Sequence, residues 1–102
     1  MPDITQARRA LVARILEGDG RASRAQRRSA FDNAAPTEPL RSLVDKVARD
    51  ASTVSDAAVE AAKASGLTED QIFEVVVCAA IGEATRQYEA ARAALDAASG
   101  RA

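Results

Sequence analysis

Histidine and tryptophan are absent from this sequence, and cysteine occurs once, at Cys78. Without an imidazole, the chain cannot build a Ser-His-Asp triad, a Cys-His pair or a histidine-ligated metal site from its own residues. One thiol excludes an intrachain disulfide and a Cys-x-x-Cys redox centre, and it is typical of a reducing compartment. No glycine-rich nucleotide-binding loop is visible. We therefore expect no self-contained hydrolytic, metal-dependent or dithiol chemistry and no bound cofactor.

Long hydrophobic runs are also lacking. None approaches the ~20 residues that span a bilayer, and the N-terminus has no signal-peptide apolar core. We expect a cytoplasmic protein without membrane association. The 102 residues predict a single domain. Because only three residues are aromatic, small aliphatic side chains must make the core, and part of the stability is expected from association with another chain.

Charge is unevenly distributed along the chain, although the net charge is only −1. Residues 1–28 hold seven arginines and three acidic residues, a balance of +4, and the remainder holds seven basic and twelve acidic residues, a balance of −5. This asymmetry is compatible with a nucleic-acid partner, or with a basic arm that lies on an acidic body of the same or a neighbouring chain. The segment lacks aromatics that stack on bases, which favours the second interpretation.

Helix signals recur along the N-terminal third. Apolar residues four apart between Leu11 and Leu16 predict a first helix that ends at Gly18. Ser23 and Gln26 have the spacing of a helix N-terminus and open a short, arginine-rich second helix. Strand signals hardly appear.

The stretch Asp32–Pro39 is the clearest break, because its two prolines exclude a continuous helix. We divide the single domain there into a basic helical arm, residues 1–35, and a helical core, residues 37–98. Thr37 is expected to cap a third helix, whose apolar face runs from Leu40 to Ala51 at spacings of three and four residues.

Two further helices follow. Ser55 is the expected N-cap of a short helix that Gly66 ends at its C′ position. Thr68 and Gln71 form a capping box, which predicts a long last helix over residues 69–98. The chain is thus expected to be an all-α bundle of about five helices.

The long helix carries an apolar stripe at 4-3-4-4-3-4 spacing that we expect to be buried: Phe73, Val77, Ala80, Ala84, Tyr88, Ala91 and Leu95. No residue between Glu74 and Glu83 is charged, so this segment is expected to be buried nearly all round. The helix is then either central in the bundle or placed between subunits. Gly82 costs about 1 kcal/mol relative to alanine in a helix, which indicates close approach by another helix or a ligand.

Four residues on this helix are the candidates for chemistry. Cys78 lies among valines and alanines, which favours a buried apolar role over a catalytic thiol. Glu74, Glu83 and Arg86 flank the apolar block, and a buried glutamate with a raised pKa would suit a general base. Glu83 and Arg86 also have the spacing of an ordinary surface ion pair. Lys46, beside an apolar helix face, fits a solvated or snorkelling role better than a catalytic one.

Residues 43–95 resemble the alkylhydroperoxidase D / carboxymuconolactone decarboxylase superfamily. The resemblance rests on a helix, a short helix that ends in glycine, the junction GLTEDQI at residues 66–72, and a long Ala/Val-rich helix. It implies an all-helical homo-oligomer, a trimer or hexamer, with a dimer also compatible. The peroxidase members carry Cys-x-x-Cys and histidine before the junction, at positions that correspond to Ala51, Val54 and Ala58. In a second alignment, residues 43–95 match the second half of longer peroxidase-like members, a half that never carries the dithiol. Both alignments imply the fold and the assembly of the family without its redox centre.

Three functional hypotheses remain open. The first is a non-redox homo-oligomer that acts by binding another protein or a small apolar or acidic ligand between subunits. The second is a decarboxylase or isomerase-type enzyme that uses Glu74, Glu83 or Arg86 at an interface, and a shared pocket with a raised carboxylate pKa would favour it. The third is a nucleic-acid-associated protein that uses the N-terminal arginines.

Overall fold

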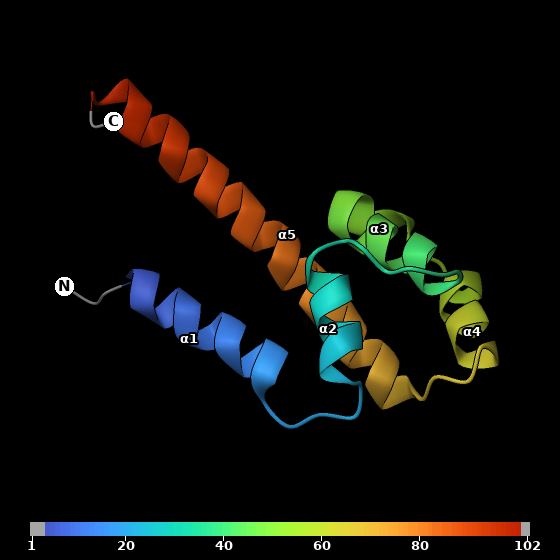
Figure 1. Cartoon of the computed structure of the whole chain (residues 1–102). Coiled ribbons are helices and arrows are strands. Elements are labelled where there is room, and N and C mark those ends of the chain that lie inside the picture. Colours follow the sequence, from blue (N-terminus) through green and yellow to red (C-terminus); the bar gives the residue numbers. More distant parts are fainter. Residues whose placement is uncertain (1–3, 101–102) are drawn as a thin grey trace.

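The computed structural model describes residues 4–100 and has no strand among them (Figure 1). Its elements are α1 (Ile4–Glu17), α2 (Arg24–Phe31), α3 (Leu40–Asp50), the 3-10 turn η1 (Ala51–Thr53), α4 (Asp56–Ala64) and α5 (Glu69–Ala98). The expectation of an all-α helical bundle is confirmed.

The molecule is elongated, with extents of 51 × 28 × 21 Å. Helices α2, α3 and α4 gather at the N-terminal half of α5, and the C-terminal half of α5 continues beyond them (Figure 1). Helix α1 approaches α5 from the other side, so the free ends of α1 and α5 lie at the same end of the molecule. This placement leaves much of the long helix uncovered.

Local capping fixes most helix boundaries where the sequence predicts them. The hydroxyl oxygens of Ser23 and Ser55 each accept a backbone N–H three residues further on. Thr68 and Gln71 cap α5 reciprocally, with hydrogen bonds of 3.2 and 2.9 Å. Gly66 has a φ of 109°, the left-handed conformation in which a side chain is strained. Short-range sequence therefore determines the start of α2, α4 and α5.

The cap of α3 differs from the expected one. Thr37 makes no side-chain cap, and Glu38 instead accepts the Ser42 backbone N–H at 2.8 Å and its hydroxyl at 2.7 Å. The longer glutamate side chain reaches the first turn, where a negative charge is favoured by the helix dipole. These two hydrogen bonds lower the pKa of Glu38.

The core joins the basic N-terminal segment to the later helices. One buried cluster combines Leu16, Ala22, Ala30, Phe31, Ala35, Val44, Val75, Cys78 and Ala79, and a smaller one combines Leu43, Ala62 and Ile72. The larger cluster draws on both sides of the proline-containing break. Helix α2 is thus packed into the core against α5 rather than lying loosely on the surface.

The stripe on α5 is not buried within the single chain, so the expectation that α5 is central in the bundle is wrong, and its burial between subunits stays a prediction. Phe73 is 68% exposed and Leu95 64% exposed, and Ala80 and Ala84 are exposed as well. The buried face of α5 is instead formed by Ile72, Val75, Cys78, Ala79 and Gly82. The segment between Glu74 and Glu83 is therefore not buried all round, because α2, α3 and α4 cover only one side of a helix that is apolar on two.

Candidate functional site: the hollow and the apolar face beside α1 and α5

Two of the four candidate residues, Glu74 and Cys78, lie together at a hollow between α1 and α5. The hollow has a volume of about 430 Å³, and its walls include Arg14 and Ile15 of α1 and Phe73 of α5. Apolar and charged groups are mixed in this lining. The other two candidates lie on a different side of α5, so the structure does not gather the four into one site.

Glu74 is a fixed anchor for the loop that precedes α2. Its carboxylate oxygens accept the backbone N–H groups of Arg21 at 2.8 Å and Ala22 at 3.0 Å. A Cβ at Gly20 would overlap the carboxylate, so any other residue there would make the Glu74 side chain shift. Burial alone raises the pKa of Glu74, but the two backbone hydrogen bonds and the charges of Arg27 and Arg21 hold it below its ordinary value. A carboxylate with a lowered pKa and both oxygens engaged is poorly suited to act as a general base.

Arg27 is the residue at this site that sequence reasoning missed. It is 5% exposed, and its Nη1 donates to the carbonyl oxygens of Ile15 at 3.1 Å and Gly18 at 2.6 Å. The guanidinium thereby satisfies carbonyls at the C-terminus of α1, where a positive charge is favoured. Ala30 and Phe31 lie three and four residues after Arg27, a spacing that places all three on one face of α2 and could have indicated that Arg27 is buried.

Cys78 packs in the core, with 1% of its surface exposed. Its thiol donates to the carbonyl oxygen of Ile15 at 3.8 Å. Burial raises the pKa of the thiol; the charge of Arg27 opposes this and Glu74 adds to it. A buried thiol with a raised pKa is a poor nucleophile.

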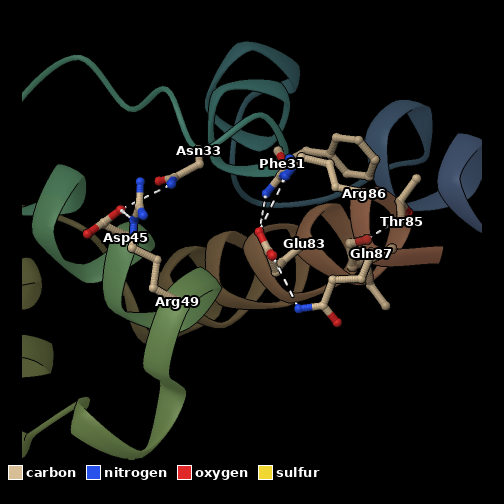
Figure 2. A network of polar contacts seen from close by, with 9 residues as sticks. Phe31, Asn33, Asp45, Arg49, Glu83, Thr85, Arg86 and Gln87 are labelled. Carbon is tan, nitrogen blue, oxygen red and sulfur yellow. Dashed lines mark hydrogen bonds and ion pairs between the residues drawn. The ribbon is translucent and has the colours of Figure 1, made fainter. Parts of the chain in front are cut away.

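Glu83 and Arg86 join α5 to the end of α2 (Figure 2). Arg86 donates through Nη1 to the carbonyl oxygen of Phe31 at 2.6 Å and through Nη2 to Glu83 at 3.1 Å. Glu83 also accepts from Gln87 at 3.2 Å. These contacts give both residues a structural role, because Arg86 satisfies a carbonyl at the C-terminus of α2 and Glu83 orients Arg86.

A second polar cluster lies nearby in the same view (Figure 2). Asp45 accepts from Asn33 at 3.1 Å and from Arg49 at 2.6 Å, and these hydrogen bonds, that of Arg49 first, lower its pKa. Lys46, the next residue, is exposed. The carboxylates with a resolved pKa shift in the described part of the chain are thus all shifted downward, the opposite of what the general-base hypothesis requires.

The positions that correspond to the dithiol and histidine of the resembled peroxidases do not share one helix. Ala51 and Val54 lie in and just after η1, and only Ala58 lies in α4. Val54 and Ala58 pack against the smaller buried cluster, whereas Ala51 is exposed. Their side chains offer no polar atom for redox chemistry.

The arginines of the N-terminal segment are partly used inside the molecule. Arg8 lies 5.1 Å from the ring centroid of Tyr88 and 3.8 Å from the carboxylate of Glu89. Arg28 pairs with Asp32, and Arg27 is buried as described. Of these three arginines, only Arg8 joins the basic arm to the later part of the chain, because the partners of Arg27 and Arg28 lie within residues 1–35.

Large apolar side chains are exposed on one common face. Phe73 and Leu95 belong to the uncovered stripe of α5, and Ile4 and Leu11, seven residues apart, lie on one side of α1 with exposures of 60% and 46%. Arg14, one turn from Leu11, shares the hollow with Phe73, so the side of α1 that carries Leu11 faces the stripe side of α5. These four are the exposed large apolar residues of the described chain. We call this surface the α1–α5 apolar face.

No group of three or more acidic, cysteine or histidine residues able to hold a metal ion is found among residues 4–100. Within the same residues, no helix is long and apolar enough to cross a membrane. Comparison of the chain with protein-family models, with curated proteins and with solved structures gives no match.

Proposed function

We propose that this protein is a binding module that acts as a homo-oligomer, with the α1–α5 apolar face as its docking surface. The observation that carries the proposal is that the four exposed large apolar residues, Ile4, Leu11, Phe73 and Leu95, all lie on α1 and α5. Monomeric proteins rarely expose large contiguous apolar patches, whereas interaction sites do so regularly. Burying one such side chain completely contributes roughly 1.5–3 kcal/mol, which is the driving force for association here.

The charge pattern supports a protein occupant. The stripe from Phe73 to Leu95 holds no charged position, and charged side chains such as Arg86 and Arg92 lie on other sides of α5. An apolar centre with a polar border is the usual anatomy of a protein interface. The small side chains Ala80 and Ala84 at the middle of the stripe let a second helix approach closely.

Analytical ultracentrifugation of the chain over a range of concentrations tests this proposal. We expect a mass at least twice that of the 10.7 kDa chain at micromolar concentration. Phe73→Ser should shift the distribution toward the monomer, and Ala61→Ser on the exposed surface of α4 is the matched control that should leave it unchanged. A monomer at every concentration would refute the proposal.

We also propose that the scaffold is that of an alkylhydroperoxidase D-like protein without the redox centre. Support comes from the order α3, η1, α4, the glycine junction and the capping-box start of α5. Apolar side chains at Ala51, Val54 and Ala58 agree with the loss of dithiol chemistry. An experimental structure of the assembly tests the assignment: long helices packed together across subunits are expected, and an α5 that is exposed in the assembled protein would contradict it.

A further inference from the structure

We propose that the second copy lies antiparallel on α5, with a two-fold axis beside Ala84. This inference rests on the proposed function, and it specifies which residues of the two copies meet. It is carried by three observations: the symmetry of the stripe, the height of α1 along α5, and the size of the exposed face.

The stripe is symmetric about Ala84. From this residue, the apolar positions follow at steps of four, three and four toward the N-terminus and at the same steps toward the C-terminus. An antiparallel pair centred there places Ala84 against its own copy and Phe73 against Leu95 of the partner subunit. The intermediate positions pair a larger with a smaller side chain, Val77 with alanine and Ala80 with tyrosine. A parallel pair would instead place each large residue against itself and each alanine against an alanine, and would leave gaps at the small residues.

Helix α1 has its exposed leucine at the level of this axis. The Cys78 thiol contacts Ile15, and Arg8 contacts Tyr88, so residues midway between Arg8 and Ile15 lie about level with residue 83 of α5. Leu11 is that midway residue and is 46% exposed. A two-fold axis perpendicular to two antiparallel helices places both α1 helices on the same side of the pair. Leu11 therefore faces its own copy, and α1 and α5 of one subunit form a layer of two helices that packs on the same layer of the partner subunit.

The face is large enough for a stable pair. The 22 steps from Phe73 to Leu95 span about 33 Å at a helical rise of 1.5 Å per residue. With α1 beside α5, the face is two helices wide, and its outline is roughly 600 Å² per copy, near the ~800 Å² per partner of a standard specific interface. One helix alone would fall well below that size, so Leu11 and Ile4 are needed to complete the interface.

The pairing also closes the hollow between α1 and α5. Phe73 forms part of its wall and is the residue that meets Leu95 of the partner subunit. The partner's α5 therefore covers the exposed side of a cavity whose other lining residues include Arg14, Arg27, Asp19 and Glu74. In the assembled protein the hollow becomes a pocket between subunits that has an apolar cover and is lined by both arginines and carboxylates.

Cysteine crosslinking in a Cys78→Ala background distinguishes the possible registers. Under mild oxidation, Ala84→Cys and Leu11→Cys should each give a covalent dimer. Because facing residues have a high effective concentration, the yield should exceed that of an exposed control, Ala61→Cys on α4, by about tenfold or more. Circular dichroism of each variant verifies that the helical fold is kept.

The decisive sample is a mixture of Phe73→Cys chains with Leu95→Cys chains. The antiparallel register predicts a crosslink between the two kinds of chain and none within either kind, because like residues are then about 33 Å apart. Crosslinks within each kind would overturn the inference in favour of a parallel pair. A heavier-than-monomer species that gives no Ala84→Cys crosslink overturns this register and leaves the proposed function standing, whereas a monomer in ultracentrifugation refutes both.

Discussion

The carbonyl group of Phe31 lies directly against the Cα of Gly82. A Cβ built on Gly82 would overlap the Phe31 carbonyl oxygen, and Arg86 donates to that same oxygen at 2.6 Å. The end of α2 can thus lie close to α5 because Gly82 has no side chain. The guanidinium of Arg86 then fixes it there by a hydrogen bond. The close approach that the sequence predicts for this glycine is confirmed, and the neighbour is another helix.

Gly82→Ala should therefore destabilise the protein, although alanine is the better helix former by about 1 kcal/mol. We expect a net loss of about 1–3 kcal/mol in the free energy of unfolding, because α2 must move to make room. Urea denaturation measures it. A gain in stability would mean that α2 does not approach α5 this closely.

Arg27→Met should cost about 2–3 kcal/mol of stability, because the carbonyls of Ile15 and Gly18 lose their donor in a buried place. The methionine keeps much of the apolar stem, so the change isolates the guanidinium. Arg24→Met, at an exposed position of the same helix, is the matched control and should stay within about 0.5 kcal/mol of the parent. Equal effects in the two variants would contradict the capping role of Arg27.

Glu74→Gln should cost about 1–2 kcal/mol at pH 7, because an amide offers one oxygen to two backbone N–H groups. The pKa of Glu74 in the folded state lies below its ordinary value of 4.5, so the ionised form stabilises the fold above that pH. This contribution is lost as the pH falls through the folded-state pKa. Urea denaturation from pH 7 to pH 3 should show the gap between parent and variant narrowing below about pH 4.5.

Glu17→Gln, an exposed change in α1, is the control for that series and should show no such narrowing. A gap between parent and Glu74→Gln that widens toward acid would mean that the pKa of Glu74 is raised. That outcome would revive the general-base hypothesis.

These contacts show how far the sequence alone leads. Ser23, Ser55 and the Thr68–Gln71 pair were predictable because a cap and its target are three residues apart. Glu74 and the loop at Arg21 are 53 residues apart, so their hydrogen bond depends on tertiary packing that periodicity does not encode. The sequence of α5 also contains two apolar faces, and its spacing predicted burial of the longer one. Burial follows the shorter face, because α2 and α3 pack on the side of α5 that carries Val75 and Gly82.

Cys78 should react slowly with a thiol reagent at neutral pH while the protein is folded. Burial raises the pKa of the thiol and leaves only 1% of the residue exposed, so little thiolate forms and the reagent hardly reaches the sulfur. Labelling with a chromogenic disulfide should be at least about a hundredfold faster in denaturant, where access is complete and the pKa is ordinary. Cys78→Ala carrying Ala61→Cys supplies an exposed thiol as control and should label rapidly in both conditions. Fast labelling of Cys78 in the folded protein would indicate that α1 opens away from α5.

The thermal unfolding midpoint should rise with protein concentration, because a second copy that binds only the folded chain stabilises it by mass action. Phe73 and Leu95 are mostly exposed in the single chain, so replacing both with serine removes little packing within it. The double variant Phe73→Ser/Leu95→Ser should therefore unfold at a midpoint that does not depend on concentration and that matches the dilute limit of the parent. Ala57→Ser/Ala61→Ser on exposed α4 should keep the concentration dependence of the parent. If the midpoint of Phe73→Ser/Leu95→Ser also rises with concentration, association takes place elsewhere on the molecule. If its midpoint lies well below that of the parent at low concentration, the stripe is needed for stability within the single chain.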